Sequence, residues 1–391
     1  MCTTPDINTV IQNLQRSLEF VGRNLLRPQR LVNAARNLRG IRRRADQVPY
    51  LPYRVTIEPT ARCNLRCSMC QLTTWDRNPH DLTLEQFRKI LDGFPTLLAI
   101  KLHGIGEPLL NKEFFAMVEE AASRGITVDT VTNGTALTDG NCRRLLDCGL
   151  GTIFVSIDGS TPETFERIRV GAKFAKVIEG SRRLIDMRGD GRRPGIHFWT
   201  TAQVDNIHEL PDIVRLAKDV GVDSLHVNHD LVYWGQDEWQ AKLEAQSLLG
   251  SQSKNGEALI QQARDVAKEL GLPFVVYTGG KFSWDEGRLC HWPWSSAFVS
   301  SEGYVVPCGV IGNQDVLNFG NMLTENIQDI WNGEGYQDFR RQMKRGDIPD
   351  VCKGCYANGG GGEKPAAGVD AFIPLADVKA QTPDHQAAVI E

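Results

Sequence analysis

Three closely spaced cysteines are the first residues whose types and spacing suggest chemistry. Cys63, Cys67 and Cys70 lie in the segment EPTARCNLRCSMC, residues 58–70, with the spacing C-x3-C-x2-C. A closed zinc site uses four protein ligands, usually as two separated pairs, so this group lacks one ligand. An iron-sulfur cluster held by three thiolates would keep one iron free of protein ligands. That iron would be open to a substrate or cofactor.

A second group of cysteines lies near the end of the chain. The sequence has ten cysteines, and four of them come late: Cys290, Cys308, Cys352 and Cys355. The last two form a CKGC motif. Four thiolates can close either a structural zinc site or an iron-sulfur cluster, so the ligands alone leave both open.

The length and composition are those of an ordinary globular protein. The chain has 391 residues, of which 41% are hydrophobic and 24% charged, and its formal net charge is -4. This charge argues against general nucleic-acid binding. No apolar run approaches the roughly 18 residues of a transmembrane helix, and the N-terminus has no signal-peptide pattern. We therefore expect a cytoplasmic protein, in which this many cysteines indicate metal or redox chemistry more than disulfides.

Short apolar runs that alternate with helical patterns predict an α/β fold. The helical patterns have N-terminal capping signals, such as Thr83 followed three residues later by Gln86. Six β-α repeats predict a parallel sheet with crossover helices, either doubly wound or a partial barrel. The expected strands cover residues 54–58, 97–103, 126–131, 151–157, 196–204 and 223–229.

Glycines and polar residues follow several of these predicted strands. HGIGEP (103–108) follows the second strand, TNG (132–134) the third and SIDG (156–159) the fourth, and NHD (228–230) follows the sixth. Ligands bind beyond the C-terminal ends of parallel strands in such folds. The first cysteine group follows the first strand, so we expect it to lie at the same end as these segments.

The cysteine motif after the first strand, together with G-x-G-E-P after the second, resembles the radical S-adenosylmethionine (SAM) superfamily. The resemblance covers residues 53–235 and implies a partial (β/α)6 barrel of the TIM type. It implies that Cys63, Cys67 and Cys70 hold a 4Fe-4S cluster, which leaves one iron for SAM. The ammonium and carboxylate of SAM suit charge-assisted pairing with Glu and Arg. The residues that the resemblance assigns to SAM binding are Met69, Gly106, Glu107, Asn133, Ser156 and Arg169.

The late cysteines extend this resemblance. Cys290 and Cys308, with Gly303 between them, are spaced as in the first half of the extension called SPASM. No cysteine follows Cys355, so the segment resembles the shortened form called a twitch domain, which holds one auxiliary cluster. The resemblance implies that all four late cysteines hold a second 4Fe-4S cluster, used for electron transfer. A structural zinc site is the alternative.

These observations divide the chain into five expected segments. The first is basic and has apolar residues at helical spacing, and we expect it to form two helices, separated near Pro28, that pack on the main domain. Weak contact with a membrane surface is the alternative. The segments are a basic helical extension (1–48), the radical SAM core (53–235), a helical linker (236–287), a small twitch-like domain (288–357) and a flexible tail (358–391).

The resemblance implies an enzyme that cleaves SAM to a 5'-deoxyadenosyl radical, which abstracts hydrogen from a substrate. Twitch-bearing relatives include an aminocyclitol dehydrogenase, so we expect an oxidoreductase that acts on a small polar, alcohol-bearing substrate of sugar-like or natural-product type. The auxiliary cluster would accept the second electron. His229 and Asp230 are candidate general bases, with His103 and Arg169 as weaker ones. An external reductant such as flavodoxin or ferredoxin is the expected partner.

Three other functions remain open from the sequence. Modification of a ribosomally made peptide is one, although residues 1–48 are too short and too helical for a peptide-binding winged-helix domain. A redox-neutral epimerase is the second, with Cys142 or Cys148 returning a hydrogen atom, although packing is the favoured role for both thiols. The third is a non-catalytic metal scaffold, which predicts that no 5'-deoxyadenosine forms.

Overall fold

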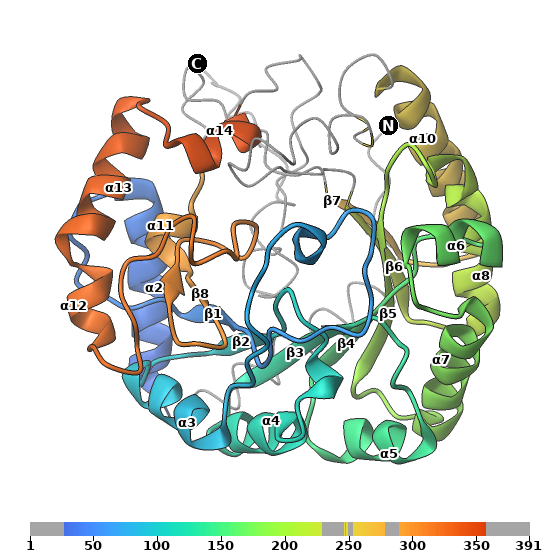
Figure 1. Ribbon diagram of the computed structural model, residues 1–391, viewed down its shortest axis with the longest axis horizontal. Coiled ribbons are helices and arrows are strands. Elements are labelled where there is room, and N and C mark those ends of the chain that lie inside the picture. Colours follow the sequence, from blue (N-terminus) through green and yellow to red (C-terminus); the bar gives the residue numbers. More distant parts are fainter. Residues whose placement is uncertain (1–26, 229–245, 247, 249–252, 278–288, 357–391) are drawn as a thin grey trace, which may run out of the picture.

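The described part of the chain folds around an open sheet of nine strands, in the order β7-β6-β5-β4-β3-β2-β1-β8-β9. The computed structural model describes residues 27–228, 246, 248, 253–277 and 289–356. Strands β1 to β7 are parallel to their neighbours, and helices line the outer side of the curved sheet (Figure 1). This arrangement agrees with the expected α/β class and with an open partial barrel.

All six strands predicted from the sequence are present. Their bounds agree with the prediction to within a few residues, and each is followed by a helix that crosses back to the next strand. The strands are β1 (Arg54–Ile57), β2 (Ala99–Leu102), β3 (Thr127–Thr132), β4 (Thr152–Ser156), β5 (Gly195–Thr201), β6 (Ser224–Asn228), β7 (Phe274–Tyr277), β8 (Phe298–Val299) and β9 (Val305–Val306).

The helices begin where the capping signals predict. Thr83 and Gln86 form a capping box before α3, and Thr161 caps α6 with Pro162 in its first turn. The α-helices are α2 (Pro28–Arg43), α3 (Leu84–Gly93), α4 (Phe114–Ser123), α5 (Asp139–Asp147), α6 (Pro162–Ile168), α7 (Phe174–Arg188), α8 (Leu210–Val220), α10 (Ser253–Glu269), α11 (Trp292–Ser295), α12 (Ile327–Trp331), α13 (Glu334–Arg345) and α14 (Asp350–Tyr356). The described residues also contain the 3-10 turns η1 (Gln71–Thr73), η2 (Pro108–Leu110) and η3 (Ile207–Glu209).

Alternation along the central strands separates the two faces of the sheet. Phe198 of β5 and Leu225 of β6 are fully buried. His197 and Trp199 on β5 and His226 on β6 point to the opposite face, where the His226 ring contacts both of the other rings. Because successive strand residues face opposite sides, the apolar set packs under the helices and the histidines face the interior of the barrel.

The prediction of a helical linker over residues 236–287 is wrong in one respect. Besides α10 it contains strand β7, which pairs in parallel with β6, Leu225 opposite Phe274. The β-branched and aromatic run Phe-Val-Val-Tyr after Pro273 is typical of a strand, so a local signal was present. The C-terminal domain also joins the sheet, because β8 pairs in parallel with β1 through Thr56 and Phe298.

Helix α2 packs on the main domain, as expected, but through a polar face. Asn33 and Asn37 both donate side-chain hydrogen bonds to the carbonyl of Leu51, at 2.9 Å each. Leu38, one of the apolar residues of this helix, is 50% exposed. The helix expected before Pro28 lies outside the described residues. Within the described part of the chain, no helix combines the length and apolar character needed to cross a membrane.

Replacing Phe198 with alanine tests the central packing. Phe198 is fully buried on β5, so Phe198→Ala should lower the free energy of unfolding by about 3–5 kcal/mol. Val32 on α2 is 49% exposed, and Val32→Ala should change it by less than about 0.5 kcal/mol. Urea unfolding of the metal-free protein would measure both. A loss below about 1 kcal/mol for Phe198→Ala would contradict the buried position.

Candidate functional site

The three early cysteines lie together on the loop that follows β1. Cys67 is buried, Cys63 and Cys70 are partly buried, and all three are free thiols. Burial, together with the nearby negative charges of Cys67 and Cys63, raises the pKa of Cys70 to about 12. Such mutual effects require the sulfur atoms to be close neighbours. The structure therefore brings together the three thiols that the spacing singled out.

Hydrogen-bond donors face two of these sulfur atoms. The backbone N–H of Leu65 and the side-chain amide of Asn133 point at Cys63 Sγ, at 3.5 and 3.9 Å. Arg169 Nη1 lies 3.9 Å from Cys67 Sγ. Donors around thiolate ligands stabilise their negative charge and tune an iron-sulfur cluster. The donor set around these thiols therefore fits a cluster.

Arg169 lies beside the cysteine loop in a buried ion pair. Its Nε donates to Asp158, which is fully buried just after β4, while its Nη1 faces Cys67. Burial opposes its charge, but Asp158 and Cys67 hold the pKa of Arg169 above the usual value. The guanidinium is thus a fixed positive charge at the loop. Its expected contact with SAM and its use as a base remain predictions.

Glu107 follows β2, and its side chain contacts the C-terminal end of β3. Its side chain accepts hydrogen bonds from Thr132 Oγ1 at 2.6 Å, from the backbone N–H of Asn133 at 2.7 Å and from that of Leu109 at 3.2 Å. Burial raises the pKa of Glu107, and these hydrogen bonds oppose that rise. Asn133 connects the two parts of the site, since it contacts both Glu107 and Cys63.

The glycines of the HGIGEP segment pack against the cysteine loop. A Cβ on Gly106 would lie 2.1 Å from the carbonyl oxygen of Thr60, and the next N–H, of Glu107, donates to Arg62 O at 2.7 Å. No side chain fits that approach. Gly106 therefore allows the cysteine loop to pack closely against this segment, a structural role that the sequence analysis did not predict. Met69 and Ser156, also expected at the SAM site, are both buried.

The four late cysteines also come together. Burial raises the pKa of Cys290 well above its usual value, and the negative charges of Cys308, Cys355 and Cys352 raise it further. The Cys290 N–H donates to the hydroxyl of Tyr356 at 2.9 Å, which fixes the start of this segment to α14. The hairpin β8–β9 leads to Cys308, and α14 carries the CKGC motif.

A cluster and a single metal ion require different arrangements of thiols. Among the described residues, no three His, Cys, Asp or Glu side chains are placed to hold one metal ion. A zinc site requires such convergence, because each thiolate lies about 2.3 Å from the ion. A 4Fe-4S cluster binds each thiolate to a different iron, so its ligands do not converge on one point.

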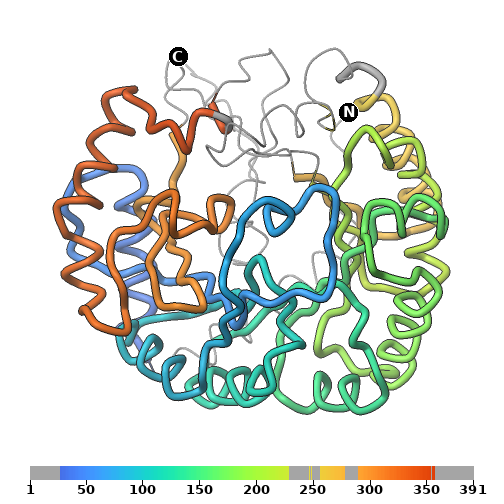
Figure 2. The backbone as a smooth tube through the Cα atoms, viewed as in Figure 1, coloured from blue at the N-terminus to red at the C-terminus, as the bar shows by residue number. Residues whose placement is uncertain are grey.

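A cavity of about 590 Å³ adjoins the cysteine loop. Cys63 lines it together with Arg62, Arg66, Trp75 and Arg77, so one expected cluster ligand borders this space. Figure 2 shows the loop between β1 and α3 as a long excursion in blue, beside the orange C-terminal segment.

Two family models match the chain in the two regions that carry the cysteines. The radical SAM superfamily model matches residues 57–217, and an iron-sulfur cluster-binding (SPASM) domain model matches residues 290–356. The chain belongs to the radical SAM superfamily. Its cofactors are a 4Fe-4S cluster and SAM in the first domain, and auxiliary iron-sulfur clusters in the SPASM domain.

Curated proteins that are similar to this chain differ in the functions that their names describe. A "tungsten-containing aldehyde ferredoxin oxidoreductase cofactor-modifying protein" of Pyrococcus furiosus is 28% identical and aligns over 76% of this chain and 86% of its own. A "PqqA peptide cyclase" of Bradyrhizobium diazoefficiens is 25% identical, over 78% of this chain and 79% of its own. The crystal structure of Streptococcus suis SuiB is similar in fold, with TM-score 0.62 at 14% identity over 85% of this chain and 77% of its own.

The interior face of this radical SAM barrel carries titratable groups that the sequence analysis missed. Burial lowers the pKa of His226 to about 3, helped by the positive charges of His197 and Lys101. Burial and the positive charge of Lys101 likewise lower the pKa of His103, a weaker candidate base, to about 3. Both imidazoles are therefore neutral near pH 7. The alternation in IHFWTT and LHVN was the signal that could have found the strand histidines.

The two favoured base candidates, His229 and Asp230, lie outside the described residues. The preceding strand β6 ends at Asn228. Their role as general bases remains a prediction. Cys142 and Cys148 are buried in the apolar core, which fits the packing role favoured for them.

The burial of Asp129 on β3 can be tested through the pH dependence of the free energy of unfolding. Burial raises the pKa of Asp129 to about 6 from its usual 3.8, with Thr152 and Lys101 opposing the rise. A raised carboxyl pKa favours folding below pH 4, and that benefit is lost as pH rises through about 6. Between pH 4 and 7, the free energy of unfolding of the wild type should therefore fall by up to about 3 kcal/mol more than that of Asp129→Asn.

Urea unfolding of the metal-free protein at several pH values would measure this difference. Asp212→Asn, on the surface of α8, serves as the control because that side chain is 61% exposed. Parallel pH profiles for wild type and Asp129→Asn would show that Asp129 ionises as freely in the folded chain as in the unfolded one.

Proposed function

We propose that this protein is a radical SAM oxidoreductase that oxidises a small, polar, alcohol-bearing substrate. The single observation that supports it is the pairing of two unequal thiol groups. The first has three cysteines beside Glu107 and Asn133, and the second has four cysteines gathered around Cys290. Three ligands leave one iron for SAM, whereas four ligands close a cluster and leave it suited to electron transfer.

Each proposed residue has a defined task at the first site. Cys63, Cys67 and Cys70 hold the first cluster. When bound, this cluster with SAM supplies a 5'-deoxyadenosyl radical for hydrogen abstraction, and the auxiliary cluster supplies an acceptor for the second electron. Glu107 has two carboxylate oxygens with about four acceptor positions, and three donors occupy part of them. The remainder suits the ammonium of SAM.

Asn133 and Arg169 fix the charge distribution around the loop. Asn133 donates to Cys63 and holds Glu107 through its backbone N–H, so it keeps the proposed ammonium site beside the cluster ligands. Arg169 brings a positive charge to Cys67 and stabilises the thiolate form that binds iron. Gly106, Met69 and Ser156 complete the proposed SAM site.

The polar interior of the barrel supports a polar substrate. His226 bonds to Ser224 Oγ at 2.8 Å and to the Tyr277 hydroxyl at 2.9 Å, and Lys101 and Asp129 lie on β2 and β3. Neutral imidazoles and hydroxyls donate and accept hydrogen bonds without a net charge, which suits a substrate with several hydroxyl groups. His229 or Asp230 would accept the proton of the oxidised hydroxyl.

Modification of a peptide is the second candidate function. The observation that favours it is the 25% identity to a PqqA peptide cyclase over most of both chains. The proposed radical step and the electron acceptor would be the same for a peptide substrate. The two candidates differ only in what enters the barrel.

Paired cysteine variants test the proposed division of labour. We expect about eight irons in anaerobically reconstituted wild type, and about four in both a Cys63→Ala/Cys67→Ala/Cys70→Ala variant and a Cys352→Ala/Cys355→Ala variant. The first variant should form no 5'-deoxyadenosine from SAM and reductant. The second should still form it, because radical generation needs only the first cluster. Iron analysis and chromatography of the products measure both quantities.

Two results would contradict the proposal. Zinc in place of iron at the late cysteines would remove the proposed electron acceptor. Absence of 5'-deoxyadenosine from the fully loaded wild type would leave a metal-bound scaffold as the function to pursue.

A further inference from the structure

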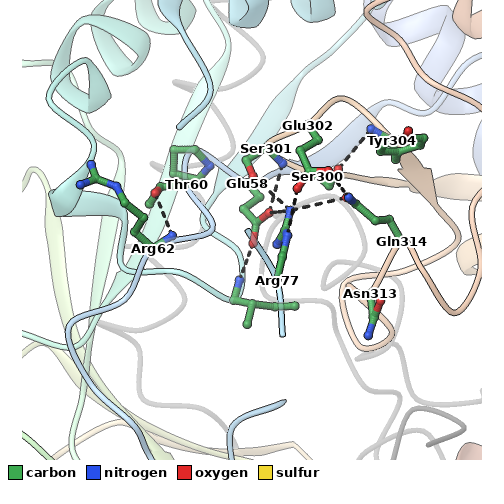
Figure 3. Close-up of polar contacts among 12 residues, drawn as sticks. Glu58, Thr60, Arg62, Arg77, Ser300, Ser301, Glu302, Tyr304, Asn313 and Gln314 are labelled. Atoms are coloured by element: carbon green, nitrogen blue, oxygen red, sulfur yellow. Dashed lines mark hydrogen bonds and ion pairs between the residues drawn. The ribbon is translucent and has the colours of Figure 1, made fainter. Parts of the chain in front are cut away.

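A buried carboxylate joins the end of β1 to two distant segments. Glu58 directly follows β1 and is 0% exposed. Its Oε1 accepts the N–H of Ile105 at 3.0 Å, and its Oε2 accepts the N–H of Ser301 at 3.1 Å (Figure 3). Ile105 lies in the HGIGEP segment, and Ser301 lies in the turn between β8 and β9. Glu58 therefore connects the proposed SAM site with the C-terminal domain.

Arg77 supplies the charge that balances Glu58. Its side chain is 3% exposed, and its Nη2 lies 2.8 Å from Glu58 Oε2. In Figure 3 the guanidinium lies between Glu58 and the segment that carries Ser301 and Glu302. Its Nη2 also donates to Ser301 Oγ at 3.1 Å, and its Nε lies 3.3 Å from Glu302 Oε1. Gln314 is a further acceptor at 3.5 Å.

Neighbouring contacts reinforce the same bridge. Gln71 Nε2 donates to the carbonyl of Ile311 at 3.3 Å, and Trp75 Nε1 donates to Asp315 at 2.8 Å. The Arg77 guanidinium also lies 4.6 Å from the centre of the Trp75 ring. Residues 71–77 follow Cys70 directly, and residues 301–315 enclose Cys308. The bridge therefore joins the segments next to one cysteine of each group.

The chemistry of this position requires arginine. The guanidinium presents several donors in a planar fork, which allows one side chain to serve Glu58, Ser301 and Glu302 together. A lysine ammonium would keep the charge but could not reach all three with that geometry. Loss of the cation would leave the buried Glu58 carboxylate without its counter-charge.

We propose that Arg77 is a positioning residue: through Glu58 it fixes the first cysteine loop to the auxiliary domain, so that SAM binding at the first site depends on this contact. The inference rests on the proposed assignment of Cys63, Cys67 and Cys70 to the SAM cluster. In this arrangement the auxiliary domain supports the geometry of the radical-forming site in addition to its proposed electron transfer.

The test compares Arg77→Lys with wild type as anaerobically reconstituted full-length enzyme. We expect unchanged iron content, a KM for SAM raised by at least about tenfold in the 5'-deoxyadenosine assay, and a smaller change in kcat. Hydrogen exchange should be faster by about tenfold in peptides that contain Ile105 and Ser301, whose amides depend on Glu58. Exchange in α4 should not change.

Arg88→Lys is the matched control. Arg88 on α3 also pairs with a glutamate, Glu120, but its side chain is 51% exposed. This substitution should leave the KM for SAM and the exchange pattern at wild-type values, since an exposed pair contributes little.

The possible failures are distinguishable. A wild-type KM for SAM in Arg77→Lys would overturn the positioning role, whether or not exchange becomes faster. Wild-type enzyme that binds iron but forms no 5'-deoxyadenosine would refute the proposed function instead, and the inference with it. If Arg77→Lys fails to load iron, Glu302→Gln decides, because it removes the charge through which Arg77 holds the auxiliary domain and leaves the Arg77–Glu58 pair in place. An unchanged KM for SAM in that variant would then refute the inference.

Discussion

The buried carboxylate of Glu58 constrains the whole arrangement of the site. A charge that is fully removed from water must be compensated by donors and by an opposite charge. Glu58 receives both, from two backbone amides and from Arg77, and these three groups belong to segments far apart in the sequence. None of the three segments can shift without exposing or unpairing that charge. The cysteine loop, the HGIGEP segment and the turn after β8 are therefore held as one unit.

Close backbone packing makes this constraint possible. A Cβ on Gly104 would lie 2.3 Å from Cγ of Glu58, and one on Gly106 would meet the carbonyl of Thr60. The two glycines admit the buried carboxylate on one side and the start of the cysteine loop on the other. Glu107 follows at once, with its N–H bonded to Arg62 and its carboxylate held from β3. One short segment thus places both the loop and the proposed SAM-binding group.

The sequence predicted the parts of the fold that have local signals. Six strands and the capping box at Thr83 were found because alternation and capping are read within a few residues. The first cysteine group was found because its spacing is a local pattern, whereas the late cysteines, spread over residues 290–355, were grouped by the resemblance to a known family. The short strand β7 also had such a signal, in its β-branched run, but the prediction assigned that stretch to a helical linker.

Other features depend on contacts between distant segments and had no local signal. Arg77 was not singled out from the sequence, because its partners Glu58 and Glu302 are distant in sequence. The pairing of β8 with β1 could not be read from either strand alone. Helix α2 buries Asn33 and Asn37 and exposes Leu38, since the surface it covers offers a backbone carbonyl that needs donors. Tertiary contacts, rather than the secondary-structure propensities of single residues, determine these features.

The most direct test of this account is anomalous diffraction, at the iron and zinc edges, from crystals of the anaerobically reconstituted enzyme with SAM. The account predicts two separate iron sites, one bound by Cys63, Cys67 and Cys70 with SAM next to Glu107, and one bound by the four late cysteines, without a zinc signal at either. Zinc at the late cysteines, or SAM bound away from Glu107, would contradict it.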